Sequence, residues 1–172
     1  TTLLFTDIAR LKNIVNKVGP VQLIFSGKAH PNDEHGKELI QQIFRFKETL
    51  NDNIKIAYIP DYDIDIARLM TAGADLWLNT PLPPMEASGT SGEKALMNGV
   101  LNLSVLDGWW AEGYKEHAGW ALPLERTFHN QGQQDELDAE RIYTLLENNI
   151  TEKFYRRNKE DIPVEWVGMV RN

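Results

Sequence analysis

The sequence predicts an α/β fold in which helices cover both faces of a parallel sheet. Four short, nearly continuous apolar runs are bounded by turn residues, at 21–25, 54–59, 76–78 and 101–106. Runs of this length and composition are typical of strands that are buried on both faces. The segments between the runs repeat apolar residues at three- and four-residue steps, which predicts helices. Strands that alternate with helices favour a parallel sheet, because parallel strands need long crossover connections.

The first third of the chain contains two helices and two strands of this pattern. A helix with one apolar face is predicted from the spacing of Leu4, Ile8, Leu11, Val15 and Val18. Gly19 and Pro20 then break the chain before the strand at 21–25, and Pro60 ends the strand at 54–59. A second helix, containing residues 39–50, is predicted between these strands.

The remainder of the chain continues the alternation. Helices are predicted at 63–70, 93–98, 140–159 and 164–170, with strands at 76–78 and 101–106. The aromatic stretch 107–120 is predicted to be irregular, and the polar stretch 131–138 to be a mobile loop. We therefore expect residues 1–172 to form a single α/β domain with a Rossmann-like parallel sheet.

Composition excludes several classes of site. The chain has 172 residues, no Cys and a net charge of −7. Disulfides and thiolate metal sites are therefore excluded, and the acidic balance argues against a nucleic-acid partner. No apolar run approaches the ~20 residues of a membrane span, so we expect no membrane partner and a cytoplasmic protein. His30 and His35 lack the i,i+4 spacing of a helical ligand pair, and we expect no metal site.

Small residues fill the turn that follows the third predicted strand, just before a helix begins. Ser88, Thr90 and Ser91 are of the types that cap helices, and Gly89 and Gly92 allow unusual dihedrals and close backbone approach. Free N–H groups at a helix start attract anions, so this turn is predicted to hold a phosphate. The spacing matches neither a Walker A loop nor a G-x-G-x-x-G dinucleotide motif.

The sequence around this turn resembles a known family. Residues 86–94 are Glu-Ala-Ser-Gly-Thr-Ser-Gly-Glu-Lys, and the chain continues as Ala-Leu-Met-Asn-Gly-Val-Leu-Asn-Leu-Ser-Val-Leu-Asp-Gly. This stretch resembles the pyridoxal-phosphate segment of the α-glucan phosphorylases, the glycogen and maltodextrin phosphorylases. Ser-Gly-Lys-Ala-His-Pro at 26–31 and Pro-Asp-Tyr-Asp at 60–63 resemble two further segments of the family. The resemblance implies a truncated C-terminal domain of a GT-B enzyme.

The resemblance also implies roles in binding the cofactor. Lys94 would carry pyridoxal 5'-phosphate covalently as a Schiff base. Thr90, with the backbone of Ser91 and Gly92, would border the cofactor phosphate, and Tyr62 would line the cofactor pocket. In this family the cofactor acts through its phosphate, as proton donor or relay to the substrate phosphate.

Substrate contacts and the activity follow from the same resemblance. Glu86 would hydrogen-bond hydroxyls of the glucosyl unit and, with Lys94, belong to the catalytic residues. Ser88 and Gly89 would contact the same sugar through main-chain groups. The implied partners are α-glucan and inorganic phosphate, which react to release glucose 1-phosphate with retention. The resemblance leaves open whether the parent is a homo-oligomer.

Two other functions compete with this hypothesis. Nucleotide-sugar glycosyltransferases of the same architecture often carry two Glu residues eight positions apart in this segment, and here Lys94 stands in place of the second. The other alternative is a non-catalytic domain without cofactor. Two departures from the family pattern, Ser-Gly-Glu at 91–93 and Trp-Trp at 109–110, favour the shorter microbial branch.

The two ends of the sequence lead us to expect a piece of a longer polypeptide. The first residue is Thr, and the last apolar pattern, at 164–170, stops close to the end. The resemblance places a basic phosphate-binding segment and a second domain in the rest of the parent. We therefore expect the isolated chain to be inactive and to retain pyridoxal phosphate weakly or not at all.

Overall fold

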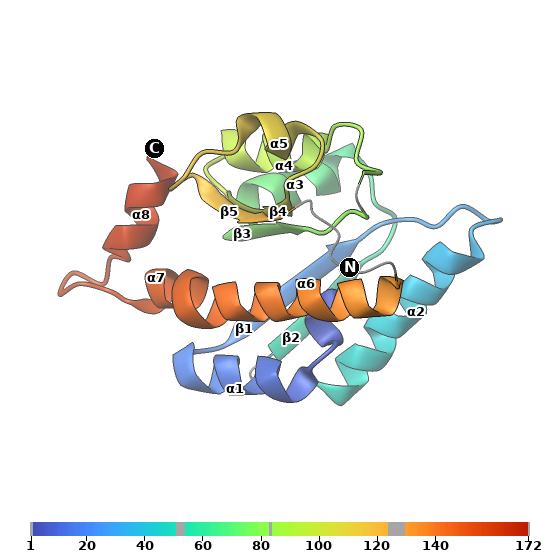
Figure 1. The fold of residues 1–172 in the computed structure, drawn as a ribbon, viewed down its shortest axis with the longest axis horizontal. Helices are drawn as coiled ribbons and strands as arrows, with labels where there is room; N and C mark the ends of the chain where they lie inside the picture. The colour runs from blue at the N-terminus through green and yellow to red at the C-terminus, as the bar shows by residue number, and fades with distance from the viewer. Residues whose placement is uncertain (1, 51–53, 83, 124–129, 172) are drawn as a thin grey trace. The chain divides into compact units, whose positions relative to one another are not determined.

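The computed structural model describes residues 2–50, 54–82, 84–123 and 130–171. The chain divides into two compact units, Thr1–Asp63 and Ile64–Asn172. In each unit parallel strands alternate with helices (Figure 1), which confirms the predicted α/β class. The single domain over 1–172 stays a prediction.

The first unit contains one parallel strand pair and its crossover helix. Its elements are η1 (Leu3–Phe5), α1 (Ile8–Val18), β1 (Val21–Ser26), α2 (Glu34–Thr49) and β2 (Ile54–Ile59). In the register of the pair, Val21 lies beside Ile54 and Ser26 beside Ile59. The helix and strand bounds agree with the sequence pattern to within a few residues, except that α2 begins earlier.

Local chemistry explains where the helices of this unit begin. The Asp7 side chain accepts a hydrogen bond from the backbone N–H of Arg10 at 2.9 Å and caps α1. Asp33 caps α2 in the same way through the N–H of Gly36, also at 2.9 Å.

Strand β1 differs from the prediction that it is buried on both faces. Burial alternates along it, and Ile24 is 44% exposed.

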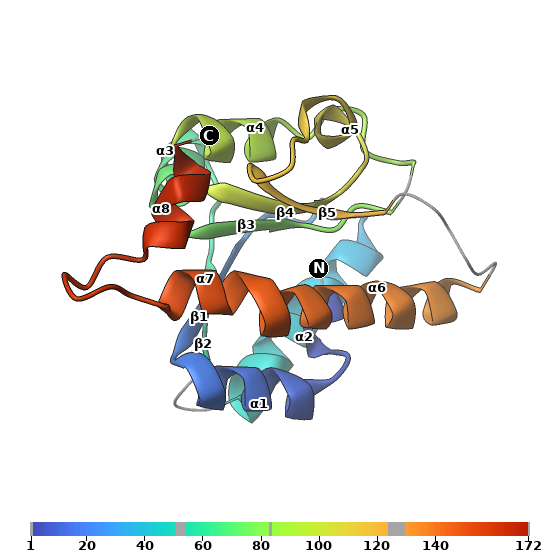
Figure 2. The ribbon, with the colours of Figure 1, turned by 60° about the vertical axis from the view of Figure 1, so that its left-hand side comes forward.

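The second unit contains a three-stranded parallel sheet. Its elements are α3 (Ile64–Gly73), β3 (Leu76–Asn79), α4 (Thr90–Met97), β4 (Leu101–Val105), α5 (Trp109–Gly113), β5 (Gly119–Leu122), α6 (Gln131–Leu145), the π-helical turn η2 (Leu146–Ile150), α7 (Thr151–Tyr155) and α8 (Val164–Val170). The strand order is β3-β4-β5, and both pairs are parallel. Helices α3, α4 and α5 lie over one face of the sheet and α6 lies over the other (Figures 1 and 2). This arrangement confirms the prediction of helices on both faces.

Strand β4 is the centre of this unit. It lies between β3 and β5, and all five of its residues are buried, as its nearly continuous apolar run predicts. Trp110 is fully buried beside it, and its Nε1–H donates to the backbone oxygen of Trp120 at 3.2 Å. A buried indole needs such a partner, so Trp110 belongs to the core.

Two segments differ from their sequence predictions. The stretch 107–120, predicted to be irregular, contains the short helix α5 and the beginning of strand β5. The stretch 131–138, predicted to be a loop, forms the first half of α6. The Asn130 side chain caps this helix by accepting from the N–H groups of Gly132 at 2.8 Å and Gln133 at 3.4 Å. The cap stabilises a polar helix that its composition alone does not indicate.

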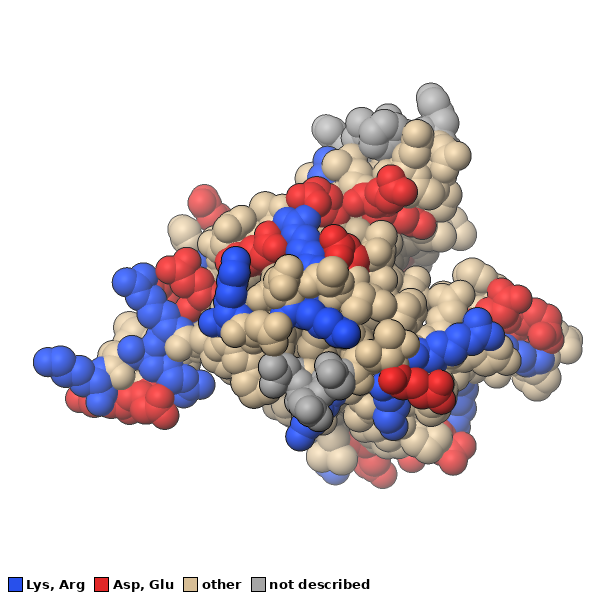
Figure 3. All heavy atoms as spheres, turned by 90° about the horizontal axis from the view of Figure 1, so that it is seen from below, with Lys and Arg blue, Asp and Glu red and all other residues tan. Residues whose placement is uncertain are grey.

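Acidic and basic side chains are interspersed on the face that Figure 3 shows, and the whole chain carries a net charge of −7. None of the described helices is both long enough and apolar enough to cross a bilayer. The described residues also contain no group of three or more His, Asp or Glu side chains placed to hold a metal ion.

Candidate functional site

The candidate site lies at the carboxyl edge of the β3-β4-β5 sheet. In the register of β3 and β4, Asn79 lies beside Ser104, so the chain leaves both strands at the same edge. The segment that follows β3 leads to α4, and the segment that follows β4 leads to α5. Sites in sheets of this kind form where such segments meet.

Two hydrogen bonds tie these two segments together, and a third lies within the segment that follows β4. The backbone N–H of Glu86 donates to Oδ2 of Asp107 at 3.0 Å, and the N–H of Gly108 donates to Oδ1 of the same carboxylate at 3.0 Å. The N–H of Trp109 donates to the backbone oxygen of Ser88 at 2.8 Å. Asp107 therefore fixes the backbone on both sides of the junction.

Two glycines make this close approach possible. Gly108 has a φ of 55°, and a Cβ there would lie 2.5 Å from the backbone oxygen of Ser88. Gly89 has a φ of 90°, and a Cβ there would lie 2.6 Å from Oε1 of Glu86. The half-buried Glu86 side chain therefore lies directly against Gly89, which is the N-cap residue of α4.

The start of α4 has open hydrogen-bond donors. The N–H of Gly92 donates to the backbone oxygen of Gly89 at 3.0 Å, whereas the N–H groups of Thr90 and Ser91 donate to no described residue. Lys94 follows Thr90 by four residues and so projects from the same helix face. Its side chain is exposed and forms no ion pair or hydrogen bond with a described residue. Open N–H groups and a nearby ammonium both attract an anion.

The first turn of α4 rests on Trp109 and Asn102. A Cβ at Gly92 would lie 2.9 Å from Nε1 of Trp109 and 3.0 Å from Oδ1 of Asn102, so only glycine fits there without a shift. Asn102 is fully buried in β4, and its Nδ2 donates to the backbone oxygen of Gly92 at 3.2 Å. Its Oδ1 accepts from no described group. Asn102 thus connects the helix start to the central strand.

Seven of the eight predicted site residues lie in one segment of the second unit, and the roles of all eight stay predictions. Glu86, Ser88, Gly89, Thr90, Ser91, Gly92 and Lys94 form one continuous segment at the sheet edge. Tyr62 belongs to the first unit, where its side chain is 40% exposed, and its role stays a prediction.

Sequence reasoning gave no role to three residues that shape the site. Asp107 stands in the quoted motif, but its contact with Glu86 depends on the pairing of β3 with β4. Trp109 enters the sequence analysis only as part of the Trp-Trp departure at 109–110, which gives no hint of its contact with the start of α4. Asn102 had a signal in the sequence, because it is a polar residue inside an apolar run that forms a buried strand.

Fold and site together define an α/β protein with a glycine-rich, open helix start and a lysine at the carboxyl edge of a parallel sheet. The family model of carbohydrate phosphorylase matches residues 3–119, and the chain belongs to this family. The resemblance drawn from residues 86–108 is thereby confirmed.

Several named relatives match almost the whole chain. Glycogen phosphorylase of Aquifex aeolicus is 50% identical over 170 residues, which are 98% of this chain and 24% of the relative. Glycogen phosphorylase of Mycobacterium tuberculosis is 44% identical over 172 residues, 99% of this chain and 20% of the relative. Maltodextrin phosphorylase of Thermococcus litoralis is 44% identical over 171 residues, with the same two shares, 99% and 20%. The chain spans between a fifth and a quarter of the length of these relatives.

Proposed function

We propose that this chain is the cofactor-carrying part of an α-glucan phosphorylase. The reaction transfers the terminal glucosyl unit of an α-1,4-glucan to inorganic phosphate and releases glucose 1-phosphate with retention. Family membership and the names of the relatives, glycogen and maltodextrin phosphorylase, support this proposal. The observation that carries it is the start of α4, where the N–H groups of Thr90 and Ser91 and the side chain of Lys94, one turn further along, have no partner among the described residues.

The residues at the start of α4 fit pyridoxal 5'-phosphate, the cofactor that phosphorylases use. Its phosphate is an anion, and the N–H groups of Thr90 and Ser91, at the positive end of a helix, donate to none of the residues that the structure describes. Its aldehyde requires a primary amine, which Lys94 offers one helical turn further along. When bound, the cofactor supplies a phosphate group that gives a proton to, or relays one toward, the substrate phosphate.

Glu86 is the residue best placed to hold the sugar. Its backbone is anchored by Asp107, and its half-buried side chain lies against Gly89, so the carboxylate has a defined direction. A carboxylate accepts hydrogen bonds only, which suits the hydroxyl groups of a glucosyl unit. Each such bond to a charged group contributes about 1.5–3 kcal/mol.

The main chain next to Glu86 completes the proposed sugar contact. The backbone oxygen of Ser88 already accepts from the N–H of Trp109 at 2.8 Å. The N–H groups of Ser88 and Gly89 donate to no described residue, and they are the donors that we assign to the sugar. Asp107 and Trp109 act as positioning residues, because Asp107 accepts from the N–H of Glu86 and the N–H of Trp109 donates to the backbone oxygen of Ser88.

Reductive labelling tests the assignment of Lys94. The chain is incubated with pyridoxal phosphate, reduced with borohydride and mapped by peptide mass spectrometry. We expect label on Lys94 well above that on the exposed Lys28 and Lys115, because the helix start attracts the cofactor phosphate. Pyridoxal, which lacks the phosphate, is the matched control and should label these three lysines alike.

The same experiment can refute the proposal. Equal labelling of all lysines by pyridoxal phosphate, or preferential labelling elsewhere, would show that the start of α4 is not the cofactor site. Lys94→Arg keeps the charge but removes the primary amine, and should abolish the preferred peptide without changing the others.

A further inference from the structure

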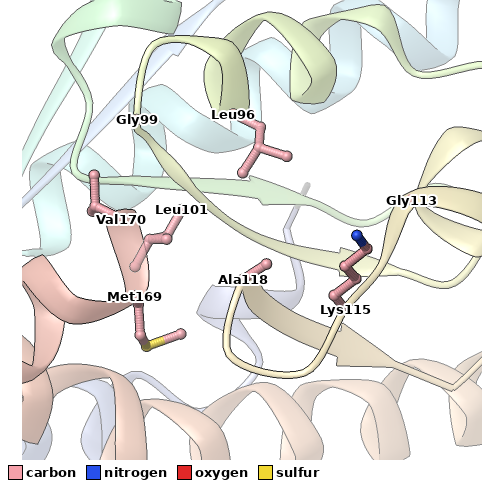
Figure 4. A pocket seen from close by; sticks show the side chains of 8 residues that line it. All are labelled: Leu96, Gly99, Leu101, Gly113, Lys115, Ala118, Met169 and Val170. Carbon is pink, nitrogen blue, oxygen red and sulfur yellow. The ribbon is translucent and has the colours of Figure 1, made fainter. Parts of the chain in front are cut away.

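A pocket in the second unit lies apart from the candidate site. It has a volume of about 290 Å³ and opens near the carboxyl end of α4 and the beginning of β4 (Figure 4). Leu96, Gly99 and Leu101 line this side, and Met169 and Val170 of α8 form a second wall. None of the residues proposed to hold the cofactor or the sugar lines it.

The third wall comes from the segment between α5 and β5. Gly113, Lys115 and Ala118 face the pocket, with the aliphatic stem of Lys115 along it and the ammonium at the edge (Figure 4). At the opposite end, a Cβ on Gly99 would lie 3.2 Å from Cγ1 of Val170, so the pocket is narrow there. The pocket therefore has an apolar, narrow end and a cationic end.

Helix α8 is held in place by aromatic contacts within the same unit. The ring of Trp166 lies 5.7 Å from that of Trp120 and 5.0 Å from that of Phe154. An ion pair of 3.1 Å between Lys153 and Glu165 adds a polar contact. The wall that α8 provides is thus formed without a ligand, as in most small-molecule sites.

The side chains that line the pocket favour a ligand with an apolar body and a negative charge. Lys115 is the charged residue that lines it, and Lys115 forms no ion pair with another described residue. The other side chains that face the pocket are apolar, namely Leu96, Leu101, Ala118, Met169 and Val170. The carbonyl end of α4, near Gly99, carries the negative end of the helix dipole and disfavours an anion there.

We propose that this pocket binds a small amphiphilic monocarboxylate. The carboxylate would pair with the ammonium of Lys115, and an aliphatic body of about six carbon atoms would lie between Leu101 and Met169. A neutral alcohol of the same length loses the ion pair, and an ammonium of the same length is repelled. This site is independent of the proposed phosphorylase function.

Titration of the ¹⁵N-labelled chain with hexanoate tests the proposal by NMR. We expect saturable shifts of the amide signals of Gly99, Gly113 and Ala118, which surround the pocket. Hexanol should bind about threefold more weakly, because an exposed ion pair contributes modestly. Hexylammonium should bind about threefold more weakly than hexanol, because a like charge beside Lys115 is unfavourable by a similar amount. Shifts that are spread over the whole chain, or equal affinity for all three compounds, would overturn the proposal.

Variants separate the charge from the cavity. Lys115→Met should lower the hexanoate affinity about threefold, to the level of hexanol, while leaving hexanol binding unchanged. Lys159→Met, at an exposed lysine of the same unit outside the pocket, is the matched control and should change neither. An unchanged hexanoate affinity in Lys115→Met would overturn the assignment of the carboxylate.

Filling the pocket should abolish binding of both compounds. Ala118→Leu places a larger side chain inside it, and Val170→Phe fills it from the partly exposed end of α8. The amide spectrum of each variant shows whether it is folded, and Val170→Phe decides the outcome if Ala118→Leu is not. Full hexanoate affinity in a folded filled variant would show that the ligand binds elsewhere.

Discussion

At Gly108, the segment that follows β4 lies close against the backbone of the segment that follows β3. Gly108 has a φ of 55°, and a Cβ at this position would lie 2.5 Å from the backbone oxygen of Ser88. A side chain therefore does not fit there. Gly168, in contrast, lies inside helix α8, and a Cβ at this position would have no described atom of another element within 4 Å. The two residues make a matched pair for testing the close approach.

We predict that Gly108→Ala destabilises the second unit by about 2–4 kcal/mol, through left-handed strain and overpacking. Gly168→Ala should be neutral or stabilising by up to about 1 kcal/mol, because alanine favours a helix. All five tryptophans lie in the second unit, so urea unfolding followed by tryptophan fluorescence reports on it alone. A Gly108→Ala midpoint equal to that of the unaltered chain would show that the segment after β3 is not held against Gly108.

Tyr155, at the end of α7, has an environment that disfavours its ionised form. Burial raises the pKa of the phenol above its usual 10.0, the Asp75 carboxylate raises this pKa further, and Arg157 lowers it in part. The folded chain therefore holds the phenolic proton more tightly than the unfolded chain does. The resulting stability is fully present below pH 10.0 and is lost as the pH rises through the folded-state pKa.

We predict that the phenolate absorbance step of Tyr155 occurs at higher pH than that of a model tyrosine. The difference between the titrations of the unaltered chain and Tyr155→Phe isolates this step. Asp75→Asn should move the step to lower pH, because one of the two raising causes is removed. A step that does not move in Asp75→Asn would exclude the carboxylate as a cause.

At the scale of elements, the start of α6 shows how one cap decides between helix and loop. We predict that Asn130→Ala destabilises the second unit by about 1 kcal/mol, because two N–H groups lose their acceptor. Asn130→Asp retains the acceptor and should preserve stability. Gln133→Ala, at an exposed position of the same helix, should stay within about 0.5 kcal/mol. Urea midpoints measure all three, and an unaffected Asn130→Ala would mean that α6 does not depend on this cap.

Most of the strands were predictable because a buried strand consists mainly of apolar residues. β2 and β4 coincide with apolar runs, and β4, with neighbours on both sides, is buried throughout. β5 was not predicted, since it has only four residues and follows a stretch dominated by aromatic side chains. The first half of α6 was not predicted either, because Gln and Asp residues give it no apolar face until Ala139 and Ile142.

The residues of the candidate site were predictable from the sequence, but their contacts with the segment that follows β4 were not. Residue types that cap helices placed the start of α4 within three residues, and Gly89 and Gly92 marked a close approach. The partners of that approach, Asp107 and Trp109, follow another strand. Their contacts arise from the alignment of β3 with β4, which local sequence patterns do not encode.

At the scale of the whole molecule, the chain spans only a fifth to a quarter of its relatives. The described part contains one site segment, whereas the proposed reaction requires glucan and phosphate to be positioned together. Such positioning supplies roughly 7–11 kcal/mol of a barrier. Residues outside this chain are expected to provide much of it.

We therefore predict that the 172-residue chain does not catalyse phosphorolysis. The chain is incubated with maltodextrin and phosphate, and glucose 1-phosphate is assayed against Lys94→Ala as the control. Product from the unaltered chain above that control would show that these residues suffice for catalysis. The labelling of Lys94 by pyridoxal phosphate is a separate readout and does not depend on turnover.

The contact between Trp109 and Gly113 has a consequence for how this family can diverge. A Cβ on Gly113 would lie 3.0 Å and 3.1 Å from two ring atoms of Trp109, and no other side chain among the described residues would lie within 4 Å of it. Glycine at position 113 leaves room for the indole ring of Trp109, although glycine has a low helix propensity and so weakens α5. A relative with a small residue at position 109 is free to accept alanine at 113, so substitutions at the two positions are not independent. Grafting the tryptophan into such a relative without the glycine is expected to displace the ring by a few tenths of an ångström.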